Sequence, residues 1–168
     1  MAADDVDRIL EQWREVRPDL DPTPMGVWGR ISRIERLAAR EIATTLATHG
    51  LHPAEFDVLA TLRRHGGALR PVELRSGMMV GSGTVTHRID LLEAAGFVER
   101  VPDETDRRGR VIQLTPAGRR VVDEAVVDHL TTEASLLAEV PEAVRRRLAR
   151  DLSSVLEALL ARSTERSG

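Results

Sequence analysis

The chain has 168 residues, of which 42% are hydrophobic and 30% are charged, and its formal net charge is −3 at pH 7. This length and composition are ordinary for a globular protein with one well-buried core. The sequence contains no cysteine, which excludes disulfides, thiolate metal sites and cysteine redox chemistry. No apolar run approaches the roughly 18 residues of a membrane span. The N-terminus is acidic and does not resemble an export leader, so we expect a cytoplasmic protein with no membrane contact.

Hydrophobic periodicity predicts two helices in the first 50 residues. Apolar side chains recur at helical spacing from Val6 to Val16, and Pro18 ends this short N-terminal helix. Thr23 and Pro24 form a favourable start for a long second helix that continues to about Gly50. Four arginines share one side of this helix: Arg30, Arg33, Arg36 and Arg40. They interleave with glutamates, so we expect a solvated or inter-subunit ion-pair face.

Three helices are predicted next, and a glycine turn joins the last two of them. A third helix opens at His52 and is closed by the glycines at 66–67, and a short fourth helix begins at Pro71. After the turn at 81–83, a fifth helix runs from about residue 82 to residue 95.

The period then changes from helical to extended. Residues 97–101 and 110–114 flank a polar loop and predict a two-stranded hairpin. Two more helices follow, from Thr115 and from Pro141. The order of these elements predicts a mainly α protein with a small β-hairpin wing, a winged helix-turn-helix whose second helix enters the major groove of DNA.

Candidate DNA contacts lie on the fifth helix and on the hairpin. The exposed side of the helix offers short hydroxyl donors and longer groups that can reach base edges: Ser82, Thr84, Thr86, His87 and Arg88. Its apolar residues are expected in the core: Val85, Ile89, Leu91 and Leu92. The hairpin carries guanidiniums that can enter a minor groove: Arg107, Arg108 and Arg110. The fifth helix could instead be an ordinary polar surface helix, and the hairpin loop could be an ordinary solvated turn. DNA binding is favoured because the hairpin follows the helix directly.

Several segments between about Leu51 and Gly118 resemble the MarR family of transcription regulators. They are EFDVL at 55–59, GTVTHRID at 83–90, GFVER at 96–100, DRR at 106–108 and LTPAG at 114–118. The resemblance implies a homodimer with intertwined terminal helices, in which two winged domains read a pseudo-palindromic operator on double-stranded DNA. We therefore expect an added helix and a dimerisation helix in 1–50, with Trp28 in the dimer core, the winged domain in 51–114 and dimerisation helices in 115–168.

The added N-terminal helix is similar to that of the urate-responsive, PecS-like branch of this family. The resemblance implies a ligand site formed by four residues: Trp13, Asp57, Arg88 and Arg100. An indole and two guanidiniums suit a purine anion, whereas the carboxylate of Asp57 would oppose it. Without ligand, Asp57 could pair with Arg100 or Arg88, and an arriving anion would compete for the arginine and shift the fifth helix.

The predicted function is thus a repressor that urate or a related purine releases from its operator. Two alternatives stay open: a MarR-type regulator that responds to an antibiotic or phenolic ligand, and a winged-helix module used only for protein contacts. No enzyme is expected, because the sequence lacks a phosphate-binding glycine motif, a nucleophile elbow and a zinc-helix motif. The scattered histidines predict no metal site, and no cofactor is expected. Gly109 in the wing departs from the bulkier residues that are common in the family.

Overall fold

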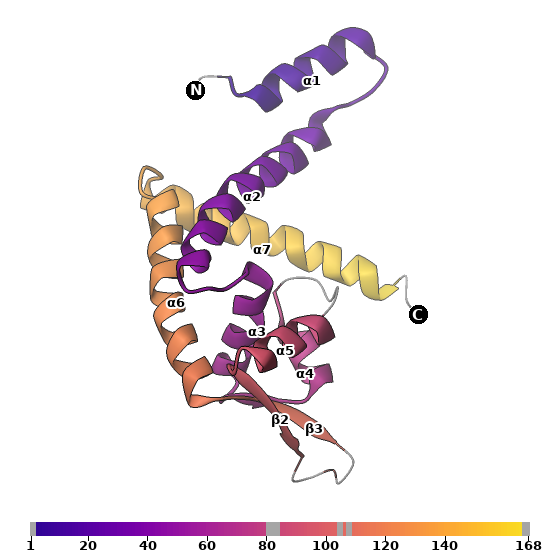
Figure 1. Cartoon of the computed structure of the whole chain (residues 1–168). Helices are drawn as coiled ribbons and strands as arrows, with labels where there is room; N and C mark the ends of the chain where they lie inside the picture. The colour runs from indigo at the N-terminus through magenta and orange to yellow at the C-terminus, as the bar shows by residue number, and fades with distance from the viewer. Residues whose placement is uncertain (1–2, 80–84, 104–105, 107–108, 166–168) are drawn as a thin grey trace. The chain divides into compact units, whose positions relative to one another are not determined.

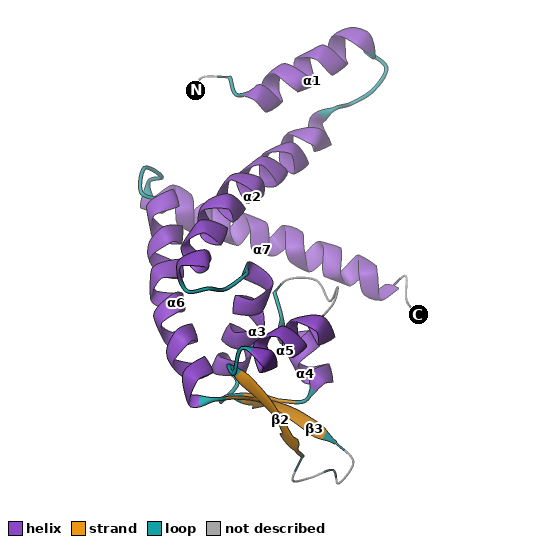
Figure 2. Cartoon of the chain, in the orientation of Figure 1, coloured by secondary structure: helices purple, strands orange, loops and turns teal. Residues whose placement is uncertain are grey.

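The computed structural model describes residues 3–79, 85–103, 106 and 109–165. Within these ranges the chain forms seven helices and three strands (Figures 1 and 2). In chain order they are α1 Asp5–Val16, α2 Thr23–Thr48, α3 Pro53–Arg64, β1 Ala68–Leu69, α4 Pro71–Gly77, α5 Val85–Ala94, β2 Val98–Pro102, β3 Arg110–Leu114, α6 Pro116–Leu136 and α7 Glu142–Glu165. The predicted mainly helical winged architecture is confirmed, and the chain divides into two compact units, Met1–Leu130 and Thr131–Gly168.

The acidic N-terminus caps α1. The carboxylate of Asp4 accepts hydrogen bonds from the backbone N–H groups of Val6 and Asp7, at 2.8 and 3.0 Å, and the carboxylate of Asp7 accepts one from the Asp4 N–H at 3.1 Å. This reciprocal capping box satisfies donors that the first helical turn leaves free. The acids that look like simple surface charge in the sequence therefore define where the helix begins.

Helix α1 is held against the start of α2 by apolar contacts and ion pairs. Its buried Val6 and Leu10 approach Gly29 and Gly26, where any added Cβ would lie 3.2–3.3 Å from the two side chains. Arg30 donates to the carboxylates of Asp4 and Asp7, at 2.8 and 2.6 Å, and Arg33 donates to Asp5 at 2.9 Å. The arginine face of α2 was predicted to be solvated or to form ion pairs between subunits. Two of its arginines instead form ion pairs within the chain, with acidic residues at the start of α1.

The core of the first unit is built around α3, in which every residue from Phe56 to Leu62 is buried. Leucines and other aliphatic residues from the surrounding elements pack against it: Leu46, Leu74, Ile89, Leu92, Val98, Ile112, Leu114 and Val122. The core therefore joins the helix-turn-helix, the hairpin and the first turns of α6 in one cluster.

The hairpin is part of a three-stranded antiparallel sheet with the order β1-β3-β2. Val98 to Pro102 pair with Leu114 to Arg110, so the predicted hairpin is present, with its first strand shifted by one residue from the predicted range 97–101. The additional strand β1 is only two residues long, and it pairs Ala68 with Gln113 and Leu69 with Ile112. It therefore joins the residues just before α4 to strand β3 of the wing.

The junction between β3 and α6 explains the LTPAG segment. The hydroxyl of Thr115 donates to the carbonyl oxygen of Gly96 at 2.7 Å and accepts from the N–H of Gly118 at 3.0 Å, while the Thr115 N–H donates to the Phe97 carbonyl at 3.1 Å. A Cβ on Gly118 would lie 1.9 Å from that carbonyl oxygen. Only glycine allows α6 to begin this close to the chain entering β2.

Helix α7 is amphipathic in sequence, yet none of its described side chains is buried. Its large apolar residues that remain exposed are Val144, Leu148, Leu152, Leu156, Leu159 and Leu160. None of the described helices is long and apolar enough to cross a membrane.

Candidate DNA-binding surface and ligand site

Helix α5 divides its residues between core and surface largely as predicted. Val85, Ile89 and Leu92 are buried, whereas Thr86 and His87 are exposed. Leu91 was expected in the core, but its side chain is 41% exposed, because it lies on the outer side of the helix next to the buried Leu92. Two other predicted DNA contacts, Ser82 and Thr84, lie outside the described residues. The described part of α5 thus presents a polar face opposite its core face.

The wing presents Arg110 at the start of β3, where its exposed side chain stands opposite Pro102 in the register of the hairpin. Arg107 and Arg108 lie outside the described residues. The described part of the loop is narrow at its base, since the Asp103 N–H donates to the Gly109 carbonyl oxygen at 3.1 Å.

Arg88 has a buried hydrogen-bond donor that the described residues leave unsatisfied. Its Nη1 donates to Oε1 of Glu55 over a long 3.4 Å, and its side chain is 25% exposed. The Nε atom is buried and has no hydrogen-bond partner within the described parts of the chain. Buried guanidinium N–H groups nearly always have an acceptor, so this position suits an acceptor atom from a ligand.

Asp57 lies on α3 and is 6% exposed. Its Oδ1 accepts a hydrogen bond from the backbone N–H of Met79 at 3.3 Å, so the carboxylate is attached to the chain that leads from α4 toward α5. The sequence suggested a pairing of Asp57 with Arg88 or Arg100. In the structure, however, Arg88 pairs with Glu55, and Arg100 pairs with Asp90 and Glu93.

Arg100 connects the first wing strand, β2, to helix α5. It lies on β2, and its guanidinium bonds to Asp90 at 2.5 Å and to Glu93, two residues one turn apart on α5. Its backbone N–H also donates to Glu93 at 3.3 Å. The hydrogen bond to Asp90 is the main cause that raises the pKa of Arg100. These acidic partners were missed, although their i, i+3 spacing on α5 marks them as neighbours on one face.

Trp13 is not brought to the other three predicted ligand residues within one chain. It lies on α1 with 40% of its side chain exposed, and α1 packs on the start of α2. Helix α2 rises about 1.5 Å per residue, so the stretch from Gly29 to Thr48 separates α1 from the start of α3 by roughly 28 Å. Asp57, Arg88 and Arg100, in contrast, lie on α3, α5 and β2, which pack in one core.

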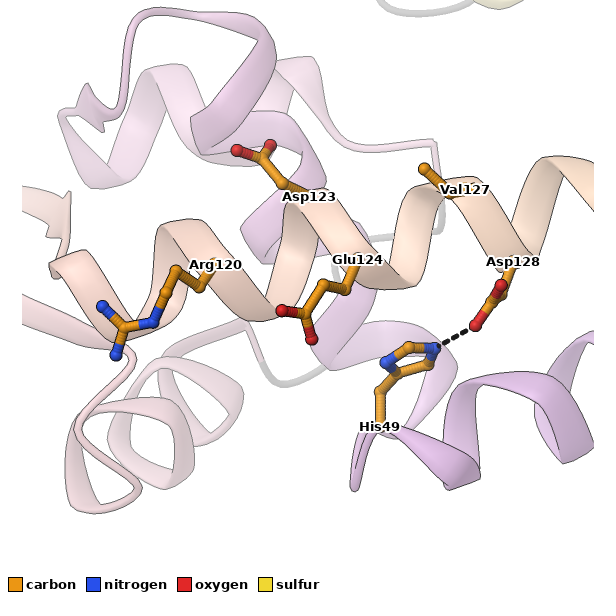
Figure 3. Close-up of a pocket in the computed structure, with 6 residues that line it drawn as sticks. All are labelled: His49, Arg120, Asp123, Glu124, Val127 and Asp128. Atoms are coloured by element: carbon orange, nitrogen blue, oxygen red, sulfur yellow. Dashed lines mark hydrogen bonds and ion pairs between the residues drawn. The ribbon is translucent and has the colours of Figure 1, made fainter.

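A shallow pocket of about 610 Å³ lies elsewhere, along α6 and at the end of α2 (Figure 3). The residues that line it are His49, Arg120, Asp123, Glu124, Val127 and Asp128. His49 Nε2 lies 2.8 Å from the carboxylate of Asp128. Three carboxylates against one arginine make this pocket a poor place for an anionic ligand.

Comparison with known proteins agrees with this architecture. Residues 49–109 match the sequence profile of the MarR family. The chain is 39% identical to the HTH-type transcriptional regulator PecS of Dickeya dadantii over 146 residues, which cover 86% of this chain and 88% of PecS. The chain belongs to the MarR family. Members of this family are DNA-binding transcription regulators and not enzymes, so the chain is a regulator of this type.

Solved MarR-family structures share the fold. AbsC from Streptomyces coelicolor superposes with a TM-score of 0.74 at 23% identity, covering 84% of this chain and 97% of AbsC. Bordetella bronchiseptica BpsR, whose DNA binding is regulated by 6-hydroxynicotinic acid, superposes with a TM-score of 0.69 at 26% identity, covering 77% and 98%. The winged helix-turn-helix is therefore the MarR-family fold.

Proposed function

We propose that this MarR-family regulator is a homodimeric repressor that urate or a related purine anion releases from a pseudo-palindromic operator. The observation that carries the ligand part of the proposal is the buried Nε donor of Arg88, which lacks a partner among the described residues and lies on the DNA-reading helix. The similarity to PecS over most of both chains supports the choice of branch.

On the DNA side, the proposal places α5 in the major groove. Exposed Thr86 and His87 face the bases and phosphates, together with Ser82 and Thr84 from the preceding turn. The wing supplies phosphate and minor-groove contacts through Arg107, Arg108 and Arg110. Local arginine charge compensates for the net charge of −3, since residues 107–120 carry five arginines and no acid.

On the ligand side, the anion bonds to Nε of Arg88 and displaces the long contact with Glu55. Its charge then lies near the buried carboxylate of Asp57, which accepts a hydrogen bond from the Met79 N–H just after α4. Repulsion between the two anions moves the α4–α5 connection and draws α5 out of its DNA-binding position. Arg100 completes the site by exchanging Asp90 or Glu93 for the ligand, which loosens the connection between β2 and α5.

A planar heteroaromatic acid has a precedent in this fold. BpsR responds to 6-hydroxynicotinic acid, which combines a ring with an acidic group as urate does. A phenolic or antibiotic ligand is the competing effector class, and it is tested alongside urate.

The homodimer is proposed from the large apolar side chains that the single chain leaves in water. On α2 these include Trp28, Ile34 and Leu37, which are 50%, 60% and 63% exposed. So many large apolar side chains exposed on one helix favour burial against a partner. A second copy of the chain would cover it, with Trp28 in the shared core, and would set two α5 helices at the spacing of two operator half-sites.

The test is a fluorescence anisotropy titration of the protein with a labelled fragment of its own upstream DNA at fixed salt. Urate, salicylate as a phenolic acid, and acetate as a simple anion are then added to the complex. We expect urate alone to release the DNA. Release by salicylate and not by urate would assign the phenolic class, and a complex insensitive to both would refute the ligand proposal while leaving the regulator intact.

Variants connect this response to the site. Asp57→Asn removes the opposing charge with little change of volume, so DNA binding should persist while the urate response weakens at least about tenfold. Arg88→Ala should impair both DNA affinity and the urate response. Arg63→Ala is the matched control, because Arg63 lies on the same helix as Asp57 but pairs with Asp123 on α6. An unchanged urate response in Arg88→Ala would refute the coupling. Trp13→Ala tests separately whether the indole belongs to the ligand site.

A further inference from the structure

A buried carboxylate lies at the base of the wing loop, where β2 ends. Asp103 follows β2 directly, and although it belongs to a surface loop, only 6% of its side chain is exposed. Its backbone N–H donates to the carbonyl oxygen of Gly109 across the loop at 3.1 Å. An aspartate at such a place ordinarily points into water, so its burial requires a compensating partner.

Arg70 is that partner, and it belongs to a different part of the winged domain. It lies between β1 and α4, and its Nε donates to Oδ2 of Asp103 at 2.5 Å. Its backbone N–H donates to Oε2 of Glu73 at 2.9 Å, which fixes the residue at the start of α4. The ion pair therefore spans 33 positions of sequence and joins the first helix of the helix-turn-helix to the wing.

Gly109 makes the inward position of Asp103 sterically possible. A Cβ on Gly109 would lie 3.1 Å from the Cβ of Asp103 and 3.2 Å from the carbonyl oxygen of Asp106. Contacts this short require the neighbouring atoms to shift by a few tenths of an ångström, so glycine fits this position with less adjustment than a larger residue. The glycine that departs from the family pattern thus accompanies the ion pair.

We propose that Arg70 and Asp103 are positioning residues for DNA binding, which hold the base of the wing loop against the start of α4 so that the wing arginines reach the DNA backbone. Asp103 lies at the loop end of the β2–β3 ladder, directly after the pairing of Pro102 with Arg110, so the ion pair fixes the direction in which the loop leaves the sheet. The inference rests on the DNA binding of the family and is independent of the identity of the ligand.

The test is a double-mutant cycle with Asp103→Asn, Arg70→Gln and the double variant, measured as the Kd for operator DNA across a series of salt concentrations. Each wing contact with a phosphate contributes about 0.9 to the slope of log K against log salt. We expect each single variant to bind about tenfold more weakly and to lose about 2 from that slope, as two wing contacts of the dimer are lost. The double variant should be no weaker than either single variant.

Two measurements separate positioning from stability. Arg63→Gln, which breaks an exposed ion pair with Asp123 in the same unit, should leave both the Kd and the slope unchanged. Thermal unfolding identifies any variant that is not folded at the assay temperature, and Arg70→Gln carries the test if Asp103→Asn fails there, because the side chain of Arg70 is 46% exposed. An unchanged slope in the folded variants overturns the proposal. Tighter binding by Asp103→Asn also overturns it, because Arg70 would then contact DNA itself.

Discussion

Replacing Gly118 by alanine should destabilise the protein, although alanine is normally the better helix former. Gly118 lies in the first turn of α6, where its absent side chain lets the carbonyl group of Phe97 approach. An added Cβ would lie 1.9 Å from the carbonyl oxygen and 2.7 Å from the carbonyl carbon, whereas real Cβ atoms essentially never come within 3.0 Å of another atom. Both sides of this contact are backbone, so no rotamer change relieves it.

The expected magnitude follows from three contributions. Overpacking of this kind costs about 1–3 kcal/mol, and displacement of α6 weakens the cap made by Thr115, which is worth about 1 kcal/mol. The helix propensity of alanine returns up to about 1 kcal/mol. The net loss is about 1–3 kcal/mol, which corresponds to a fall of roughly 2–12 °C in Tm for a chain of this size.

Differential scanning calorimetry of both proteins at one concentration measures this change. Ala117→Gly, one residue earlier in the same helical turn, serves as the propensity control and should cost about 1 kcal/mol. A Gly118→Ala protein with an unchanged or higher Tm would show that the close approach of α6 and Phe97 does not restrict this position.

Three further predictions concern α1 and the core. Arg30→Ala should reduce the hydrogen-exchange protection of α1 while leaving DNA affinity unchanged, because Arg30 bonds to both capping carboxylates; equal protection in both proteins would refute a docking role. Backbone hydrogen bonding lowers the pKa of Asp4, and the bond from Arg30 lowers that of Asp7, so their contribution should persist above the ordinary value of 3.8 and disappear as the pH falls below it. Trp13 fluorescence followed from about pH 6 to about pH 2.5 should report this loss, and a flat signal would contradict it. Leu59→Ala, at a fully buried position, should lower the free energy of unfolding by about 2–5 kcal/mol in urea titrations, and a loss below about 1 kcal/mol would contradict the packing.

The helices were predictable because their ends carry local signals. Proline at the starts of α3, α4 and α6 fixes φ there, and the glycines after α3 and α5 adopt the positive φ that ends a helix. Strand β1 could not be found in this way, because two residues give no periodicity and the pairing depends on β3, more than 40 residues later in the chain. The reciprocal cap of α1 is not evident from the sequence, because an acidic N-terminus is equally compatible with exposed surface charge.

The sequence identifies the candidate site residues, but it does not identify their ion-pair partners. Sequence similarity selects Asp57, Arg88 and Arg100, whereas the choice of carboxylate for each arginine depends on how α3, α5 and β2 pack. Arg100 pairs with α5 because β2 runs beside that helix. Arg70 and Asp103 gave no signal at all, since neither a charged residue before a proline nor an aspartate in a polar loop suggests a partly buried ion pair.

The exposed apolar side of α7 has a thermodynamic consequence for the proposed homodimer. A helix gains most of its stability from burial of its apolar face, and α7 buries none of its described side chains against its own chain. If the proposed homodimer covers this face, the order of the segment becomes a property of a pair of chains, and its melting temperature should rise with protein concentration by mass action. Newly made subunits would stay partly unfolded until they meet a partner, so the cell would lose unpaired copies to proteolysis first.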